Sequence, residues 1–596
     1  MTGRHTAGLD IIVNGTSILP KIAEVLAWVS VEEDGRTSAK AEIGFRDPRN
    51  ASLFKKSGIE LSSEIEVKAK TGSGELISVF KGEVTECEAR ASADTSGSSG
   101  HTGGMLTVIR GRDLSHRLRL GRRTAAYEGK TAGEIVKQVV ERAHLHQCEV
   151  EDTGFQYEHL SQPGMSDWDF LGHLARENGR DLYFRDGKLH FKKRVPAGAG
   201  QDALLHFGDN LISVQTAASL AHQVPKVEVR GWDREGRKAV VSEARTPGGG
   251  AWGGQAKSSS APYAPLVLTD LPRTKSASAP TAAAAVAKSM AEEVGAGLMR
   301  LHAVTRGEPK LRLRSVVKLK GLGEQFEGRF TVTKVRHHFH PVQGYRTELT
   351  VDEGGNRAVA GQPGDAEAGM RRIPGFMRGK VTDIKDPKKL GRVRVKLDCL
   401  DKDYVTTWAE TVQLSGSRGH GVVLPWVGDV VAVVFEQGRL DSPLVVGAVD
   451  DPIDKVTHTM DLVDGGKGSP NLRTFASKNG HRLELKDADG SGTGATLTTG
   501  GDGKLKIQLD LSETVISIDS KGAVDIKAAD GVSIDAGKGL LKLKGNSVLV
   551  SARQEISLEA GTVDVKARGK LRAHGALAEF SGDTVAKLTA AMVNIN

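Results

Sequence analysis

The segment from Gly522 to Gly561, GAVDIKAADGVSIDAGKGLLKLKGNSVLVSARQEISLEAG, repeats every eight residues and decides the fold of the C-terminal part of the chain. Apolar side chains recur at two positions of each octad, two residues apart, with Lys542 as the exception at the second position. The first position holds Val524, Val532, Leu540, Val548 and Ile556, and the second holds Ile526, Ile534, Val550 and Leu558. Residues two apart in a strand share a face, so each octad predicts a short strand with one apolar face and a glycine-permitted turn. A short fixed period is typical of β-solenoids and intertwined β-helices.

The octads also constrain assembly, because a strand with one apolar face cannot bury that face alone. Two arrangements satisfy the pattern: one chain coiling on itself with three octads per coil, or three chains winding into one triangular prism. The octads contain glycine corners but no ladder of Cys, Asn or aromatic residues that would cap single-chain coils. No proline follows Pro470, as central strands require. We favour the three-chain prism, with the nine residues above as its core.

The chain divides into four segments by pattern. Residues 1–364 read as mixed α/β, with low-complexity loops expected at Ser92–Gly104 and Gly248–Ala285. Residues 371–452 contain about five short strands and predict a small closed β-barrel. Residues 453–480 are a glycine-rich connector, and residues 481–596 are the octad needle.

Three local signals stand out in the first segment. Thr131 and Glu134 have the spacing of a capping box, which predicts a helix that begins there. Ser166 is expected to cap a second helix, and Asn178-Gly179 to end it. Asp186-Gly187 predicts a tight hairpin between two apolar strands.

Composition restricts the classes of function. The chain of 596 residues has 82 Lys and Arg against 74 Asp and Glu, so its net charge of +8 reads as a solvated surface and not as a nucleic-acid-binding face. Cys87, Cys148 and Cys399 lack metal-ligand spacing and indicate folding in a reducing compartment. Met1–Gly15 has no long apolar core, so no signal peptide is expected and assembly is predicted in the cytoplasm.

Candidate enzyme motifs are weak. Gly129-Lys130-Thr131 mimics the end of a phosphate-binding loop, but Thr124 stands where that loop needs glycine. A metal site is also suggested by His337, His338 and His340. Strand alternation argues against it, because it puts His337 and His338 on opposite faces. We therefore predict no catalytic, cofactor-binding or metal-binding residues and no enzyme activity, while a carboxylate pair for glycoside cleavage stays open because acidic residues are widespread.

Several longer motifs stand out in two segments of the chain. In the first segment they are YEGKTAGEIV at Tyr127–Val136, Tyr157–His159 with Gln162, and SDWDFL at Ser166–Leu171. In the barrel segment they are GKVTDIKDP at Gly379–Pro387, LGRVRV at Leu390–Val395, LPWVGDVVAVVFE at Leu424–Glu436, and Asp441–Pro443. These motifs resemble those of VgrG-type spike proteins of contractile injection systems, and the resemblance covers nearly the whole chain in domain order.

The resemblance implies a mainly β protein with an α+β hub of two related barrels, an OB-fold neck, and an intertwined triple-stranded β-helix. It further implies a homotrimeric baseplate hub and spike that caps the inner tube, is driven through a target membrane when the sheath contracts, and carries effector cargo. The implied partners are the inner tube protein, baseplate proteins and a PAAR-like tip protein. Because Ala591–Asn596 still alternates apolar and polar residues, we expect Val593 and Ile595 to contact that tip protein.

Two other functions remain as alternatives. An OB fold that binds single-stranded nucleic acid needs exposed aromatic residues beside a basic groove. This barrel offers Phe376, Tyr404, Trp408 and Trp426, of which Trp426 is expected to be in the core. The second alternative is a spike that also hydrolyses peptidoglycan. The sequence does not distinguish a type VI system from a phage tail or an extracellular particle.

Overall fold

The structure is a computed structural model of the chain. It describes residues 8–35, 37–46, 54, 57–91, 105–145, 147–194, 203–220, 223–233, 238–247, 266–268, 279–352, 373–414, 421–449, 463–488, 493–500 and 503–595. The predicted loop Ser92–Gly104 and part of the predicted connector lie outside these ranges. Two compact units are present, Met1–Lys455 and Val456–Asn596. The fold is mainly β with few helices, as predicted.

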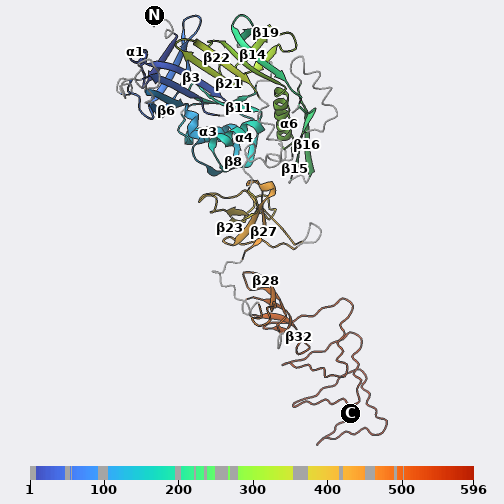
Figure 1. Ribbon diagram of the computed structural model, residues 1–596. Coiled ribbons are helices and arrows are strands. Elements are labelled where there is room, and N and C mark those ends of the chain that lie inside the picture. The colour runs from blue at the N-terminus through green and yellow to red at the C-terminus, as the bar shows by residue number, and fades with distance from the viewer. Residues whose placement is uncertain are drawn as a thin grey trace. The chain divides into compact units, whose positions relative to one another are not determined.

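An eleven-stranded sheet organises the first unit (Figure 1). Its order is β14 (Leu211–Ala218), β18 (Met299–Arg306), β22 (Gly344–Val351), β21 (Lys334–His340), β3 (Leu26–Asp34), β4 (Lys40–Arg46), β7 (Met105–Arg112), β6 (Leu76–Ala91), β5 (Glu64–Lys70), β1 (Leu9–Val13) and β2 (Thr16–Ser17). Strand β21 pairs with β3 in antiparallel register, His337 opposite Val31. This pairing joins the beginning of the chain to residues near 340.

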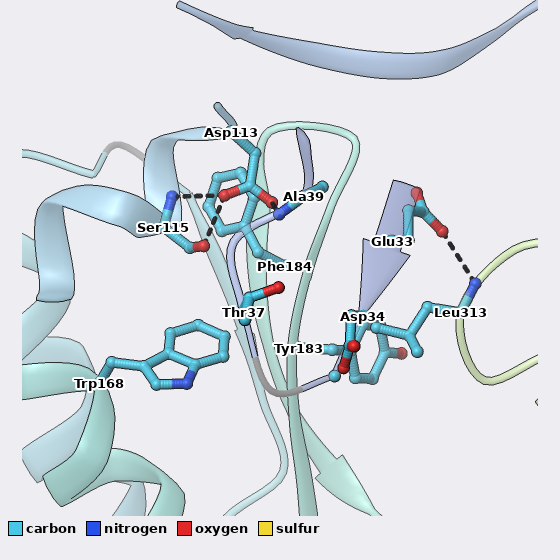
Figure 2. Close-up of a pocket in the computed structure, with 11 residues that line it drawn as sticks. Glu33, Asp34, Thr37, Ala39, Asp113, Ser115, Trp168, Tyr183, Phe184 and Leu313 are labelled. Carbon is cyan, nitrogen blue, oxygen red and sulfur yellow. Dashed lines mark hydrogen bonds between the residues drawn. The ribbon is translucent and has the colours of Figure 1, made fainter. Parts of the chain in front are cut away.

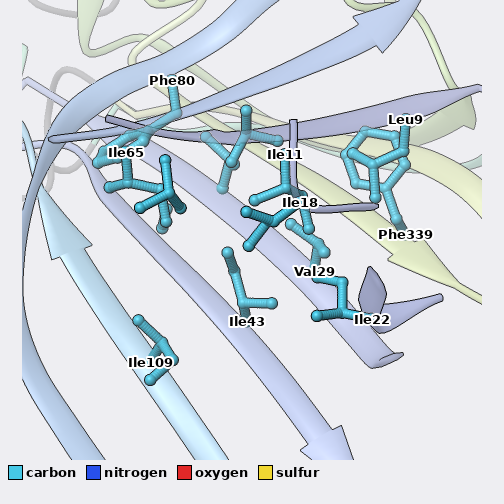
Figure 3. Packing of buried hydrophobic residues seen from close by; sticks show 14 of the residues in the cluster. Leu9, Ile11, Ile18, Ile22, Val29, Ile43, Ile65, Phe80, Ile109 and Phe339 are labelled. Atoms are coloured by element: carbon cyan, nitrogen blue, oxygen red, sulfur yellow. The ribbon is translucent and has the colours of Figure 1, made fainter. Parts of the chain in front are cut away.

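The core under this sheet follows from strand alternation (Figure 3). In β1, β3 and β5 every second side chain is buried, and Ile11, Val29 and Ile65 are completely shielded from solvent. The short helix α1 (Leu19–Ile22) adds Ile22 to the same cluster. Burying a side chain of this size stabilises the fold by about 1.5–3 kcal/mol.

An α/β insert lies between β7 and β14 in the chain. It contains η1 (Leu114–Arg119), the paired strands β8 (Arg123–Thr131) and β10 (Gln156–Met165), helices α3 (Ala132–Arg142) and α4 (Asp167–Glu177), and the sheet of β9 (Cys148–Val150), β11 (Arg180–Arg185) and β12 (Lys188–Lys193). The predicted capping box and the Ser166 cap are confirmed. The hairpin is confirmed too, since Asp186 and Gly187 both have the positive φ that a tight β11–β12 turn requires.

Two smaller sheets complete this part of the unit. One contains β13 (Ala203–His206), β19 (Val316–Lys320) and β20 (Gly328–Thr331); the other contains β16 (Lys238–Arg245), β15 (Lys226–Asp233) and β17 (Leu266–Leu268). Helix α6 (Ala279–Ala296) packs on β15 and β16 (Figure 1). The expected loop Gly248–Ala285 was therefore wrong at its C-terminal end. Alanine is the strongest helix former, and Ala283 is buried in the cluster that α6 forms with β15 and β16.

A five-stranded sheet follows, in the order β24 (Arg394–Lys396), β23 (Phe376–Asp383), β26 (Val430–Phe435), β27 (Pro443–Ala448) and β25 (Glu410–Thr411), with the short η3 (Glu436–Gly438) after β26. The predicted strand Val430–Phe435 is confirmed. The expectation that Trp426 is in the core was wrong, because its side chain is 49% exposed. Trp426 lies in the turn before β26, where its N–H donates to the Asp429 side chain at 2.8 Å.

The second unit begins with an antiparallel meander. Strands β28 (Leu472–Ala476), β29 (Arg482–Lys486), β30 (Gly494–Thr499), β31 (Leu505–Asp510) and β32 (Val515–Ser520) pair in chain order. The octad needle was predicted from residue 481, but residues up to 520 form this intrachain sheet. From Lys521 to Ile595 the single chain has turns and bends but no assigned strand or helix. No helix among the described residues is both long and apolar enough to cross a bilayer.

Candidate functional site: an unburied apolar surface on the second unit

The nine octad residues predicted to form a core are exposed in the single chain. Their exposed fractions run from 54% at Ile556 to 85% at Leu540. Val593 and Ile595, the expected tip contacts, are also exposed. Within the described ranges, no layer from the same chain covers these side chains. Their roles as trimer core and tip contact stay predictions.

The sheet β28–β32 presents a second apolar set, which sequence reasoning missed. Antiparallel register places Phe475, Leu483, Leu497, Ile507 and Ile518 in one cross-strand row, and Leu485, Ala495, Leu509 and Ile516 in the next. The large side chains of both rows are exposed. We call these two rows, together with the nine octad residues, the C-terminal apolar surface.

The opposite face of this sheet is polar and yet more buried. Glu484, Thr496 and Thr498 are each less than 9% exposed, and Arg482 and Lys486 contact the Glu484 carboxylate at 3.6 and 3.4 Å. A sheet that folds around its own core has its apolar face inside and its polar face in water. The burial here is the reverse. The strict alternation of Leu505, Ile507, Leu509 and Leu511 was the sequence signal that could have identified this face.

A polar joint connects the α/β insert to the five-stranded sheet. The hydroxyls of Ser161 and Tyr404 are hydrogen-bonded at 2.8 Å, although they are 243 positions apart. Arg394 forms an ion pair with Glu128, and Lys388 approaches Glu158 at 3.4 Å. Hydrogen bonding from His159 and the Arg394 charge lower the pKa of Glu128, while burial raises the pKa of Tyr404. The joint thus fixes the five-stranded sheet on the insert through partly buried polar contacts.

A small pocket in the first unit holds two buried carboxylates (Figure 2). The backbone N–H groups of Ala39 and Ser115 donate to Asp113 at 2.9 and 3.0 Å, and the N–H of Leu313 donates to Glu33 at 2.8 Å. Burial raises the pKa of Asp113 to about 7. The cavity measures about 10 Å³, which is the space of one water molecule and too small for a sugar.

The Gly129–Thr131 motif and the histidines near position 337 do not form a phosphate or metal site among the described residues. The first turn of α3 is already occupied by the Asp152 carboxylate, which accepts from the Gly133 N–H at 3.1 Å and the Thr131 hydroxyl at 2.6 Å, where a phosphate would have to bind. His337 is buried with the Tyr345 hydroxyl 2.8 Å from its Nδ1, while His338 is partly exposed. Burial lowers the pKa of His337 to about 4. Within the described residues no group of three or more potential metal ligands occurs.

The four aromatic residues that the sequence offered for nucleic-acid binding differ in exposure. Tyr404 is buried, while Phe376 and Trp426 are 62% and 49% exposed. The Arg394 guanidinium lies 5.9 Å from the Trp408 ring centre. Binding of single-stranded nucleic acid uses several accessible rings along a basic groove, so Tyr404 is not available for stacking, whereas Phe376 and Trp426 are accessible.

Comparison with solved structures finds distant likenesses to secretion and tail proteins. A type VI secretion component of E. coli, described as similar to the T4 tail proteins gp27 and gp5, has 15% identity and a TM-score of 0.44 over 74% of this chain and 99% of its own. One chain of the Francisella PdpA–VgrG complex has 8% identity and a TM-score of 0.47 over 86% of this chain and 80% of its own. The 43 kDa tail protein of prophage MuSo2 from Shewanella oneidensis has 12% identity and a TM-score of 0.41 over 58% and 96%. No curated protein matches the chain.

Two family models match the sequence itself. Residues 377–449 match the type VI secretion system and phage-baseplate injector OB domain, which is the segment that carries the quoted barrel motifs. Residues 4–340, more than half of the chain, match the model described as the Alg8 N-terminal domain. The chain therefore belongs to the family with the Alg8 N-terminal domain, and its injector OB domain makes it a VgrG-type spike component of a type VI secretion or phage-tail-like baseplate.

Proposed function

We propose that three copies of this chain wind together through the C-terminal apolar surface and form the central spike of a contractile injection system. The supporting observation is the reversed burial of the second unit, in which apolar rows face water and polar residues are covered. Two further copies provide an apolar layer of matching chemistry, since each copy carries the same rows. Burial at about 25 cal/mol per Å² then accumulates over every octad of all three chains.

The proposed trimer acts mechanically. Its hub end caps the inner tube and contacts baseplate proteins, and its needle crosses the target envelope when the sheath contracts. The spike is assembled in the cytoplasm inside the particle and carries effector cargo and a PAAR-like tip protein outward. The polar joint around Ser161 and Tyr404 supports this role, because it ties the neck to the insert.

A deletion pair tests the octad architecture. Removing Lys538–Gly545 takes out one complete octad, so the strand phase and glycine corners of the later octads stay aligned. Removing only Lys538–Leu541 shifts every later corner by half an octad. We expect mass photometry to show a trimer of three times 63.4 kDa for the wild type, a slightly lighter trimer for the octad deletion, and a loss of trimer for the half-octad deletion.

The same particles report on piercing. Reconstituted particles that carry the octad deletion should contain spike at wild-type occupancy but release less dye from loaded target cells, because their needle is shorter. A stable folded wild-type monomer would refute the assembly. Equal dye release by particles that lack the spike altogether would refute the piercing role and leave the assembly intact.

A further inference from the structure

A groove of about 920 Å³ opens in the first unit, between the α/β insert and the strands that follow it. One wall is formed by β11 and β12, with Tyr183, Arg185 and Lys193. The other is formed by β13, the end of β18 at Arg306, and the segment Gly307–Ser315. Ligand pockets in proteins measure about 300–1,000 Å³, so this volume holds a ligand of several residues.

Ion pairs between the two walls hold the groove open. Arg314 contacts Asp181 of β11 at 3.1 Å, and Arg312 contacts Asp186 of the β11–β12 turn at 3.3 Å. Arg312 is itself anchored by Glu33 of β3, where its Nε donates to the carboxylate at 2.7 Å. The walls are therefore positioned before any ligand binds, which lowers the entropy cost of binding.

The groove carries an excess of positive charge. Its lining contains six cations and three carboxylates: Arg185, Lys192, Lys193, Arg306, Lys310 and Arg314 against Glu151, Asp181 and Glu308. Lys192 is neutralised by Glu149 at 2.5 Å, and Arg314 by Asp181. Lys193, Arg306 and Lys310 are exposed and form no ion pair with the described part of the chain.

Arg306 of the groove has a second cation as its cross-strand neighbour. Antiparallel register places Arg306 of β18 directly opposite Arg346 of β22. Like charges in this position repel each other. A bound anion offsets that repulsion, so the arrangement favours a negatively charged ligand.

The other lining residues favour an acidic peptide over a nucleic acid as the anionic ligand. Tyr183 is the one aromatic residue among the described lining and is only 8% exposed, so bases have no ring to stack on. Leu204 of β13 is 43% exposed within the groove and offers an apolar contact. The edge of β13 is closed to strand addition, because the Asn210 side chain donates to the Leu204 carbonyl at 2.8 Å and accepts from the His206 N–H at 2.9 Å.

We propose that this groove binds an acidic peptide segment of a partner protein, with its carboxylates on Lys193, Arg306 and Lys310 and an apolar side chain on Leu204. The contacts are made by side chains and not by added strand pairing. The proposal does not depend on the trimer or on the needle, because every residue of the groove lies in the first unit.

Fluorescence anisotropy with a labelled peptide of alternating Glu and Leu tests the proposal on the full chain. The Lys193→Gln, Arg306→Gln, Lys310→Gln triple variant should weaken binding about tenfold, since each of the three exposed ion pairs contributes a factor of about two. The matched control changes exposed cations elsewhere, Lys21→Gln, Lys238→Gln and Arg378→Gln, and should stay within about twofold of the wild type. Thermal unfolding of both triples checks their folding.

Three further results decide the matter. Binding of the Glu-Leu peptide should fall with rising NaCl, and a Gln-Leu peptide should bind much more weakly. Equal losses in the groove triple and in the control triple would overturn the proposal, because binding would then follow net charge alone. Tighter binding of single-stranded oligo-dT than of the Glu-Leu peptide would also overturn it, in favour of a nucleic-acid groove.

Discussion

Replacing Ile518 by Asp tests whether the sheet face of the C-terminal apolar surface is an assembly interface. Ile518 lies in β32 beside Ile507 and is 59% exposed in the single chain. Fully burying an isoleucine is worth about 1.5–3 kcal/mol, so covering the exposed part contributes about 1–2 kcal/mol per chain. Three copies lose about 3–5 kcal/mol in the variant, which alone weakens trimer formation by at least about a hundredfold. Burying three carboxylates near one another adds to this loss.

Ser517→Asp is the matched control, because it introduces the same charge one residue earlier on the opposite face. Ser517 is paired with Gln508 on the polar side of the sheet. Mass photometry across a dilution series should show trimer for the wild type and Ser517→Asp, and monomer or aggregate for Ile518→Asp. Circular dichroism shows whether the first unit stays folded in each variant. If both substitutions dissociate the trimer equally, or if Ile518→Asp leaves it intact, the face assignment is wrong.

Three further predictions concern the octads, the tip and the first unit. Ile534→Asp should abolish trimer assembly while Asp535→Ala leaves it unchanged by sedimentation; equal effects would show that the octad phase is misassigned. Deletion of Thr589–Asn596 should keep the trimer but abolish capture of a PAAR-like tip protein in a pull-down, and full-affinity capture would place the cap elsewhere. Because burial raises the pKa of Asp113 from its ordinary 3.8 to about 7, the folded chain holds this proton more tightly than the unfolded chain, so the free energy of unfolding should fall as pH rises from about 4 to about 7. Urea unfolding should show that Asp113→Asn reduces this pH dependence, and an identical slope in the variant would contradict the assignment.

Local signals allowed parts of the fold to be predicted residue by residue. The capping box at Thr131 and the Asp186-Gly187 turn each depend on contacts within a few positions of sequence, so tertiary context had little room to change them. The strand Val430–Phe435 could be predicted equally well, because a run of β-branched residues bounded by turn residues favours a strand over a helix.

Other features depend on contacts that the sequence does not display. Trp426 follows a proline in a strongly apolar stretch, yet the turn held by Asp429 leaves it outside the barrel. Ala283 belongs to a low-complexity stretch, but it lies in helix α6 and packs against β15 and β16. The groove unites residues more than a hundred positions apart, such as Lys193 and Arg306, and no local pattern brings them together.

The reversed burial of the β28–β32 sheet has a consequence for the cell that makes this chain. A newly synthesised copy exposes apolar rows together with the free edges of β28 and β32, which is a combination that promotes aggregation. Unpaired copies should therefore be substrates for chaperones and proteases, whereas the proposed trimer would cover the apolar rows and escape removal. Copies made in excess of their partners should therefore not accumulate. The number of finished spikes should be set by the slower of two steps, synthesis of the chain and its assembly.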